Sequence, residues 1–141
     1  MIEVVNRQRR RKINTRPWRQ FSERVLSQID RPQQSATIVF VNNDAIRRLN
    51  RDFRGQNRTT DVLSFPTVAE AFEAENESQL GEVVVSLERA AAQAKQNGLT
   101  FTNEVQQLIL HGLLHLCGYD HETDNGEMNR LELKLRKKLG I

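Results

Sequence analysis

The chain has 141 residues, 38% apolar and 28% charged, which is the composition of an ordinary globular protein. This length suits one hydrophobic core, so we expect a single domain over residues 1–141. The formal charge is +3, yet residues 7–12 alone carry five cations, and the rest of the chain has a net charge of −2. A uniformly cationic surface that would coat nucleic acid is therefore excluded.

The sequence also bears on the cellular compartment. A single cysteine, Cys117, excludes an intramolecular disulfide framework and fits a reducing environment. No apolar run approaches the roughly 20 residues needed to span a bilayer. The basic segment near the N-terminus is not followed by the apolar stretch of a signal peptide. We therefore expect a cytoplasmic protein that makes no contact with membranes.

The first half of the chain predicts two strands and two helices. Apolar alternation favours a strand at 2–5, and Pro17 favours the start of a helix that reaches residue 29. The β-branched run at 36–41 is the strongest strand signal in the chain. Asn43 or Asp44 can cap a short helix whose inner face carries Ile46, Leu49 and Phe53.

The second half predicts two more strands and three helices. The strands are expected at 61–65 and 81–85, separated by a solvated loop at 67–80 that carries four glutamates and no base. Ser86 can cap a helix that Gly98 ends, and Thr102 can cap the next helix, which runs to about Cys117. Asp124 and Glu127 form a capping box for the last helix, whose inner side carries Met128, Leu131, Leu135 and Leu139. Strands interleaved with helices indicate an α+β fold, a mixed sheet with helices packed on it.

All three histidines of the chain lie in one short segment, at His111, His115 and His121. Residues four apart project from one face of a helix, so His111 and His115 can bind the same metal ion. Gly118 can end the helix in the left-handed conformation and turn the chain so that His121 approaches as a third ligand. Three neutral imidazoles leave the fourth tetrahedral position to water, which is the arrangement of a catalytic zinc site.

This segment has two other interpretations. Two buried histidines in an apolar helix could simply be core residues, but this gives no reason for a third histidine just beyond a helix-ending glycine. Cys117 is a possible fourth ligand, but it lies two residues past His115 and points to the opposite side of the helix, so an apolar filler is favoured. We therefore predict a metal site at the end of this helix.

The spacing is that of the metzincin proteases, whose motif is H-E-x-x-H-x-x-G-x-x-H. Gly112 occupies the position of the glutamate that activates water in those enzymes. A peptidase that lacks its general base would lose a large factor in rate, so proteolysis is disfavoured. We expect Gly112 instead to leave open space beside the metal for a bulky substrate.

Arginines recur at Arg47, Arg51, Arg54 and Arg58. A solvated helix face explains most of them. Arg54 differs, because it precedes Gly55, where the helix should end and a loop begin, and loops at the ends of elements present functional groups. An arginine there could bind phosphate through two hydrogen bonds and stabilise charge that develops during phosphoryl transfer.

The segment from His111 to His121, read as H-G-x-L-H-L-x-G-Y-D-H, closely resembles the signature of the YbeY family of rRNA-maturation endoribonucleases. Two further blocks resemble that family: Phe53-Arg54-Gly55 followed by Thr60–Pro66, and Gly81–Ser86. Glu82, Asn57 and Thr59 depart from the family pattern, and none of them belongs to the histidine motif.

The resemblance implies a four-stranded, mostly parallel sheet surrounded by about five helices. It implies one zinc ion held by His111, His115 and His121, and it makes Arg54 the counterpart of a functionally important arginine. The implied activity is cleavage of single-stranded RNA, in maturation of the small-subunit rRNA 3′ end and in ribosome quality control. The expected partners are single-stranded rRNA and the small ribosomal subunit, with no DNA.

Several alternatives stay open on the sequence alone. The attacking nucleophile could be water or the 2′-OH of the RNA, and no general base is evident. The protein could instead be a non-catalytic ribosome-assembly factor with a structural metal, or a metal-dependent hydrolase of another substrate. Only one Trp, one Tyr and six Phe are present, so no stacking platform for bases is evident, and RNA would be held mainly by charge. The basic run at 7–12 is either an exposed strand end or a contact with RNA.

Overall fold

A computed structural model describes residues 1–67, 79–120 and 122–141. These residues form a four-stranded mixed sheet and five helices, as predicted. The strands are β1 (Ile2–Asn6), β2 (Ser35–Val41), β3 (Val62–Pro66) and β4 (Gln79–Ser86). The helices are α1 (Thr15–Gln28), α2 (Asn43–Arg54), α3 (Leu87–Asn97), α4 (Phe101–Leu116) and α5 (Glu127–Leu139).

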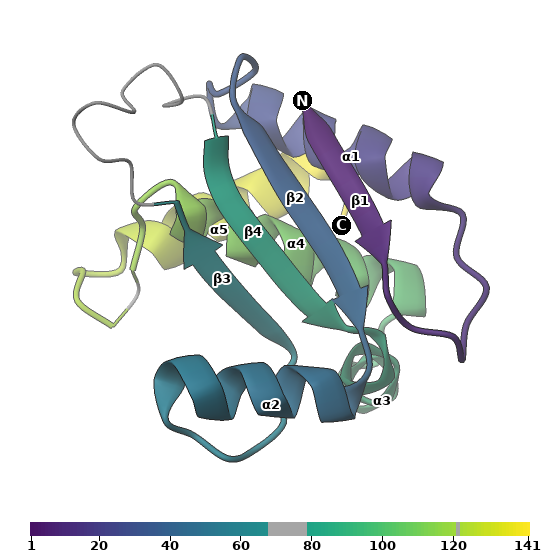
Figure 1. Ribbon diagram of the computed structural model, residues 1–141. Coiled ribbons are helices and arrows are strands. Elements are labelled where there is room, and N and C mark those ends of the chain that lie inside the picture. Colours follow the sequence, from purple (N-terminus) through teal and green to yellow (C-terminus); the bar gives the residue numbers. More distant parts are fainter. Residues whose placement is uncertain (68–78, 121) are drawn as a thin grey trace.

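The sheet has the strand order β1-β2-β4-β3. Strands β1, β2 and β4 are parallel, and β3 pairs antiparallel with β4 at the left edge of the sheet in Figure 1. The three parallel strands run towards the end of the sheet at which α2 and α3 begin. The mostly parallel sheet that the family resemblance implied is therefore confirmed.

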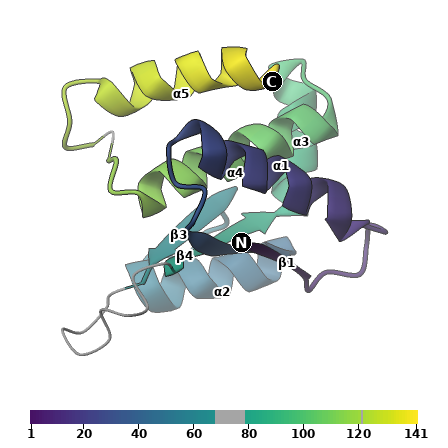
Figure 2. The ribbon, with the colours of Figure 1, turned by 90° about the horizontal axis from the view of Figure 1, so that it is seen from above.

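The helices cover the two faces of the sheet unequally. Helices α1 and α4 pack on one face, and α5 lies outside α4, so that this side of the molecule is two helices deep (Figure 2). Helix α2 lies alone on the opposite side, against the ends of β3 and β4. Helix α4 is consequently the central helix of the fold, between the sheet and α5.

The main core lies between the sheet and α4. One side of each parallel strand faces this core, with Ile38 and Phe40 of β2 and Val83 and Val85 of β4 fully buried. Helix α4 contributes a ring of buried leucines, isoleucine and valine to the same cluster. A smaller cluster around Ile46 joins α2 to the other face of the sheet. This burial holds α4 rigidly against the sheet, and α4 carries two of the three histidines.

Several helix boundaries follow the predicted caps. The hydroxyl of Ser86 accepts the N–H of Arg89 and begins α3, and Gly98 ends it with φ 66°. Gly55 ends α2 with φ 68°, directly after Arg54. Side-chain oxygens that bond the first free N–H groups of a helix, and glycines that adopt the left-handed region, account for these ends.

Other boundaries differ from the prediction. Helix α1 begins at Thr15, capped by Asn14, with Pro17 in its first turn as expected. Helix α2 is capped by Asn42 and so begins earlier than expected. Helix α4 is capped by Thr100 rather than Thr102, and Phe101 packs against the core at this earlier start. The box-like cap expected for α5 is present in a shifted form, with Gly126 at the cap position. The carboxylate of Asp124 accepts the N–H groups of Gly126 and of Met128 in the first turn, and the carboxylate of Glu127 accepts the N–H of Asn125.

Two further expectations hold only in part. Phe53 lies on the inner face of α2, where it contacts Phe65 of β3, but 69% of it is exposed. Strand β4 begins at Gln79, inside the predicted acidic loop, most of which (68–78) lies outside the described residues. Within the described part of the chain, no helix is both long enough and apolar enough to cross a membrane.

Candidate active site

Helix α4 presents His111 and His115 on one face, one turn apart. Their Nε2 atoms lie 3.1 Å from each other, and the ring planes are inclined at 76°. Two nitrogens bound to one tetrahedral zinc at 2.0–2.1 Å lie about 3.3 Å apart, so the observed spacing suits a shared metal ion. Both imidazoles are half-buried. The helical geometry predicted from their i, i+4 spacing is therefore present.

The end of α4 is built as the sequence suggested. Gly118 has φ 96°, and its N–H bonds the carbonyl of His115. The carboxylate of Asp120 accepts the N–H of Glu122, and its carbonyl accepts the N–H groups of Thr123 and Asp124. The chain thus turns sharply just past the helix. His121 itself lies outside the described residues, so its role as third ligand stays a prediction.

No group of three or more His, Cys, Asp or Glu side chains that could hold a metal ion occurs among residues 1–67, 79–120 and 122–141. The donors that are described nevertheless fit a zinc ion. Two imidazole nitrogens converge on one point, and imidazole is a ligand that zinc prefers.

The carboxylate of Glu132, on α5, bonds the other nitrogen of His111. Oε1 of Glu132 lies 3.0 Å from Nδ1 of His111, and the Glu132 residue is 7% exposed. An ionised carboxylate can only accept, so Nδ1 carries the proton, and in the neutral ring the lone pair lies on Nε2. Nη2 of Arg136 approaches the same Oε1 at 3.7 Å. Carboxylates that orient a metal-binding imidazole in this way are common around zinc.

Gly112 faces the sheet and not an open space. A Cβ atom at this position would collide with Cγ1 of Val83 on β4 and would lie 3.2 Å from Oγ of Ser64 on β3. The same Ser64 hydroxyl donates a hydrogen bond of 3.1 Å to the carbonyl of Gly112. The expectation that Gly112 leaves room for a bulky substrate is therefore wrong, because Val83 and Ser64 fill that room. Its role is close packing of α4 on β3 and β4.

Arg54 comes from a part of the sequence that is distant from the histidines. It is the last residue of α2, and the loop that follows is tied back to the helix: Nδ2 of Asn50 donates to the carbonyl of Arg58, and Nε of Arg47 donates to Asn57. Arg54 is exposed and lines the same pocket as His111 and His115. The fold thus brings together residues that lie about 60 positions apart in the chain.

We call this cavity the histidine pocket. It has a volume of about 480 Å³, and it is lined by Arg54, Asp61, Val62, Ser64, Pro66, His111, His115, Gly118, Tyr119, Asp120 and Glu122. Two of its carboxylates are already engaged. Asp61 accepts the N–H of Val62 and the amide of Gln93, and Asp120 accepts the N–H of Glu122. Arg54 is the cation among its lining residues.

A second pocket, of about 660 Å³, lies on the other side of His111. Its polar lining comes from Asp61 and from α3, α4 and α5, and the buried carboxylate of Glu104 accepts the amides of Gln93 and Asn97. This pocket is larger than the histidine pocket, but it contains neither His115 nor Arg54. The chemistry predicted from the sequence therefore belongs to the smaller cavity.

The family model described as Endoribonuclease YbeY matches residues 3–140. This chain belongs to the YbeY family. A Geobacter metallireducens protein named Endoribonuclease YbeY is 38% identical over 141 residues, which cover 99% of this chain and 94% of the relative. A Clostridioides difficile protein of the same name is 46% identical over 109 residues, or 74% of this chain and 71% of that one.

The fold agrees with that of a solved structure. The solution structure of TM1509 from Thermotoga maritima matches with a TM-score of 0.66 and 28% sequence identity, and it covers 99% of this chain and 89% of that one.

Sequence reasoning missed Glu132, although the sequence contains a signal for it. Glu132 follows Met128 by four residues and precedes Leu135 by three, so it is a charged residue on the apolar face of α5. The sequence also contains no signal for the role of Ser64, because the hydrogen bond from Ser64 to α4 depends on tertiary packing. Cys117 was assigned correctly as a packing residue. It contacts the core, and burial raises the pKa of its thiol, although Arg31 acts in the opposite direction.

Proposed function

We propose that this member of the YbeY family is a zinc-dependent endoribonuclease that cleaves single-stranded RNA. In this proposal it matures the small-subunit rRNA 3′ end and acts in ribosome quality control. The observation that carries the proposal is that Arg54 lines one pocket with His111 and His115. A cation that binds phosphate and two converging imidazoles that bind a metal ion are groups that can catalyse phosphodiester cleavage. The names of the relatives support the same activity.

The histidines would hold the ion, with His111 and His115 supplying their Nε2 atoms and His121 the third nitrogen. Glu132 would keep the His111 ring in the orientation and tautomer that ligation needs. A bound zinc ion supplies Lewis acidity towards a phosphate oxygen.

Arg54 would bind the phosphate group of the RNA. Its guanidinium can donate two parallel hydrogen bonds to the non-bridging oxygens, and it offsets the negative charge that grows in the transition state. Asp61 and Asp120 are held by N–H groups of the protein, so neither is placed as a free general base. Attack could come from the RNA 2′-OH or from water. A 2′,3′-cyclic phosphate on the product indicates the former, and a 5′-phosphate with a 3′-OH indicates the latter.

The filled space at Gly112 argues against a peptidase. Val83 and Ser64 occupy the position in which the side chain of a metzincin glutamate would begin. A non-catalytic ribosome-assembly factor could have the same fold. It would cleave no RNA and would keep its function in Arg54→Ala, whereas the enzyme would lose most of its activity in that variant.

The test measures metal content and RNA cleavage together. The wild-type protein and His115→Ala are purified under identical conditions, and bound metal is measured by mass spectrometry. We expect about one zinc per chain in the wild type, strong loss in the variant, and cleavage of single-stranded RNA by the wild type alone. A metal-free wild type with full activity would refute the metal role. A loaded protein that cleaves a peptide but not RNA would refute the nuclease. If the two imidazoles instead share a direct N–H···N hydrogen bond and bind no metal, the wild type and His115→Ala will both contain no zinc.

A further inference from the structure

Large apolar side chains are exposed at four positions in the described part of the chain: Met1, Phe53, Tyr119 and Leu133. Two of these four belong to the histidine pocket or adjoin it. Tyr119 lines the pocket and is 37% exposed. Phe53 directly precedes Arg54 and is 69% exposed. Single exposed apolar residues are normal on proteins, but their position beside the same pocket calls for an explanation.

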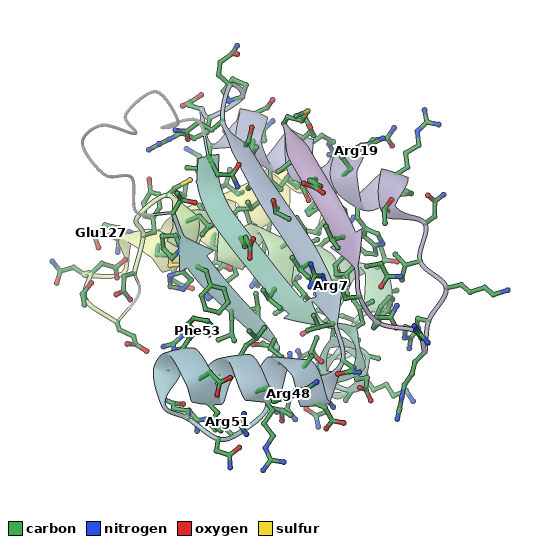
Figure 3. The ribbon with its side chains drawn as sticks, viewed as in Figure 1. Arg7, Arg19, Arg48, Arg51, Phe53 and Glu127 are labelled. Carbon is green, nitrogen blue, oxygen red and sulfur yellow. The ribbon has the colours of Figure 1, made fainter. Side chains whose placement is uncertain are left out.

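The ring of Phe53 is held in place while most of its surface faces solvent. It contacts Phe65 edge to face, with ring centroids 5.4 Å apart and planes at 68°. The side chain of Phe65 packs on the α2 face of the edge strand β3, whereas its neighbours Ser64 and Pro66 line the histidine pocket. Figure 3 shows Phe53 at the end of α2 that adjoins β3. An aromatic ring that is restrained in this way loses little conformational freedom when a ligand covers it.

Positive charge surrounds this aromatic pair. Residues 43–58 contain five arginines against two aspartates. Arg47, Arg51 and Arg54 follow each other at i, i+4 and i+7, so they share one face of α2, which leads to the pocket. Figure 3 shows Arg48 and Arg51 projecting from the same helix. A polyanion could therefore follow α2 into the histidine pocket.

We propose that Phe53 and Tyr119 are stacking platforms for the two bases that flank the phosphate held at Arg54. This inference rests on the proposed function and extends it to the recognition of the substrate. Unpaired bases stack on aromatic side chains without regard to sequence, whereas the bases of a duplex are already stacked on each other. The platforms thus give the site its preference for single strands, and composition alone gave no sign of them.

The arrangement suits RNA better than an apolar protein surface. Each platform exposes a single ring: Phe53 directly precedes Arg54, and Tyr119 lines one pocket with it. This arrangement matches the alternation of base and phosphate along a nucleic-acid strand. A protein partner would instead need a continuous apolar patch. Apart from Tyr119, the described lining of the histidine pocket consists mainly of polar and charged residues.

The test measures binding of a short fluorescein-labelled single-stranded RNA by anisotropy, at fixed salt, with the zinc-loaded protein. Phe53→Ala and Tyr119→Ala should each weaken binding, by roughly 5- to 150-fold, which corresponds to the loss of one stacked base. Phe53→Trp and Tyr119→Phe keep an aromatic ring and should bind within about twofold of the wild type. Leu133→Ala is the matched control, because it removes an exposed apolar side chain of α5 outside both pockets. It should leave the affinity for the RNA unchanged.

A second measurement separates stacking from a general disturbance of the site. An RNA that lacks the base at one position next to the cleaved bond should lose affinity for the wild type. If that base rests on Phe53, the same RNA should show little further loss with Phe53→Ala. Thermal unfolding and zinc content of Phe53→Ala should match the wild type, because the side chain is exposed.

The outcomes distinguish this inference from the proposed function. If the wild type cleaves single-stranded RNA and both alanine variants bind it equally well, the stacking role is wrong and the nuclease stands. Equal weakening for single-stranded and duplex RNA would also overturn stacking. If the wild type neither binds nor cleaves RNA but captures a purified protein through these rings, both proposals fail.

Discussion

Nδ1 of His111 on α4 lies 3.0 Å from Oε1 of Glu132 on α5, in a largely buried position. The last helix of the chain is thereby joined to the histidine helix through a polar contact as well as through apolar packing. Arg136, one turn further along α5, lies 3.7 Å from the same carboxylate oxygen. Helix α5 therefore supports the candidate metal site without contributing a ligand to it.

Replacing Glu132 tests this support. Glu132→Ala should lower zinc affinity by about 10- to 100-fold, because the imidazole loses the partner that sets its ring orientation and tautomer. Glu132→Gln keeps an acceptor oxygen and should lose less. Affinity is measured by competition with a chromophoric chelator. Glu88→Ala serves as the control, because it removes a half-buried carboxylate that bonds Asn43 and Arg10 outside both pockets. Unchanged zinc affinity in Glu132→Ala would contradict the orienting role.

Gly112→Ala tests the contact of α4 with the sheet. Two effects oppose each other: alanine favours a helix over glycine by about 1 kcal/mol, whereas overpacking a core costs about 1–3 kcal/mol. Overpacking should prevail, because the new Cβ would collide with Val83, whose branched side chain is fully buried in β4. Urea denaturation should therefore show a lower free energy of unfolding.

A second substitution makes the Gly112 test specific. Val83→Ala removes the colliding methyl groups, so the double variant should be more stable than the sum of the two single losses predicts. Additive losses, or a Gly112→Ala variant more stable than the wild type, would show that this space is open after all.

Arg54 should matter for catalysis and not for folding. Because the side chain is exposed, Arg54→Ala should change the free energy of unfolding by no more than about 0.5 kcal/mol. Cleavage of single-stranded RNA should fall by about 10²- to 10³-fold, the cost of removing one preorganised charge-stabilising group. Arg54→Lys should recover only part of the rate, since lysine lacks the planar pair of donors.

The control for Arg54 is Arg19→Ala, an exposed arginine of α1 that Figure 3 shows far from α2. Zinc content is measured for every variant. Full cleavage by Arg54→Ala at normal zinc content would contradict the catalytic role of Arg54, whereas the absence of cleavage by the zinc-loaded wild type would favour the non-catalytic assembly factor.

The basic run at 7–12 is partly structural. Nη1 of Arg10 lies 3.0 Å from Oε2 of Glu88, and the guanidinium of Arg11 lies 4.2 Å from the centre of the Phe101 ring. Arg11→Ala should therefore lower the free energy of unfolding by about 0.5–1 kcal/mol, whereas Arg9→Ala should change it by less than about 0.5 kcal/mol. Urea denaturation measures both. Equal effects would show that the contact with Phe101 contributes nothing.

Binding of RNA to this run is a separate question. Substitution of Arg7, Arg9 and Lys12 together should weaken RNA binding and flatten its dependence on salt if the run contacts phosphates, and zinc affinity should not change. An unchanged salt dependence would leave the run with a structural role only.

The sequence determined those features that depend on neighbours within one or two turns of the chain. The alternation of apolar residues placed the strands, Ser86 and Gly98 bounded α3, and the four-residue spacing placed His111 and His115 on one helix face. Each of these features follows from backbone geometry and short-range hydrogen bonds, and the residues that determine them are close together in the sequence. Gly118 turned the chain for the same reason.

Only the tertiary structure decided what surrounds the histidines. The approach of Arg54 to the pocket, the contact of Glu132 with His111 and the close packing of Gly112 on Val83 all join residues 20 or more positions apart. The burial of Phe53 was also not predictable from the sequence. Helical periodicity gives the side of α2 on which Phe53 lies, but its position at the end of the helix beside β3 decides how much of it is covered. Such contacts are set by how apolar faces pack together, and the side chains that meet there carry no local signal of their partners.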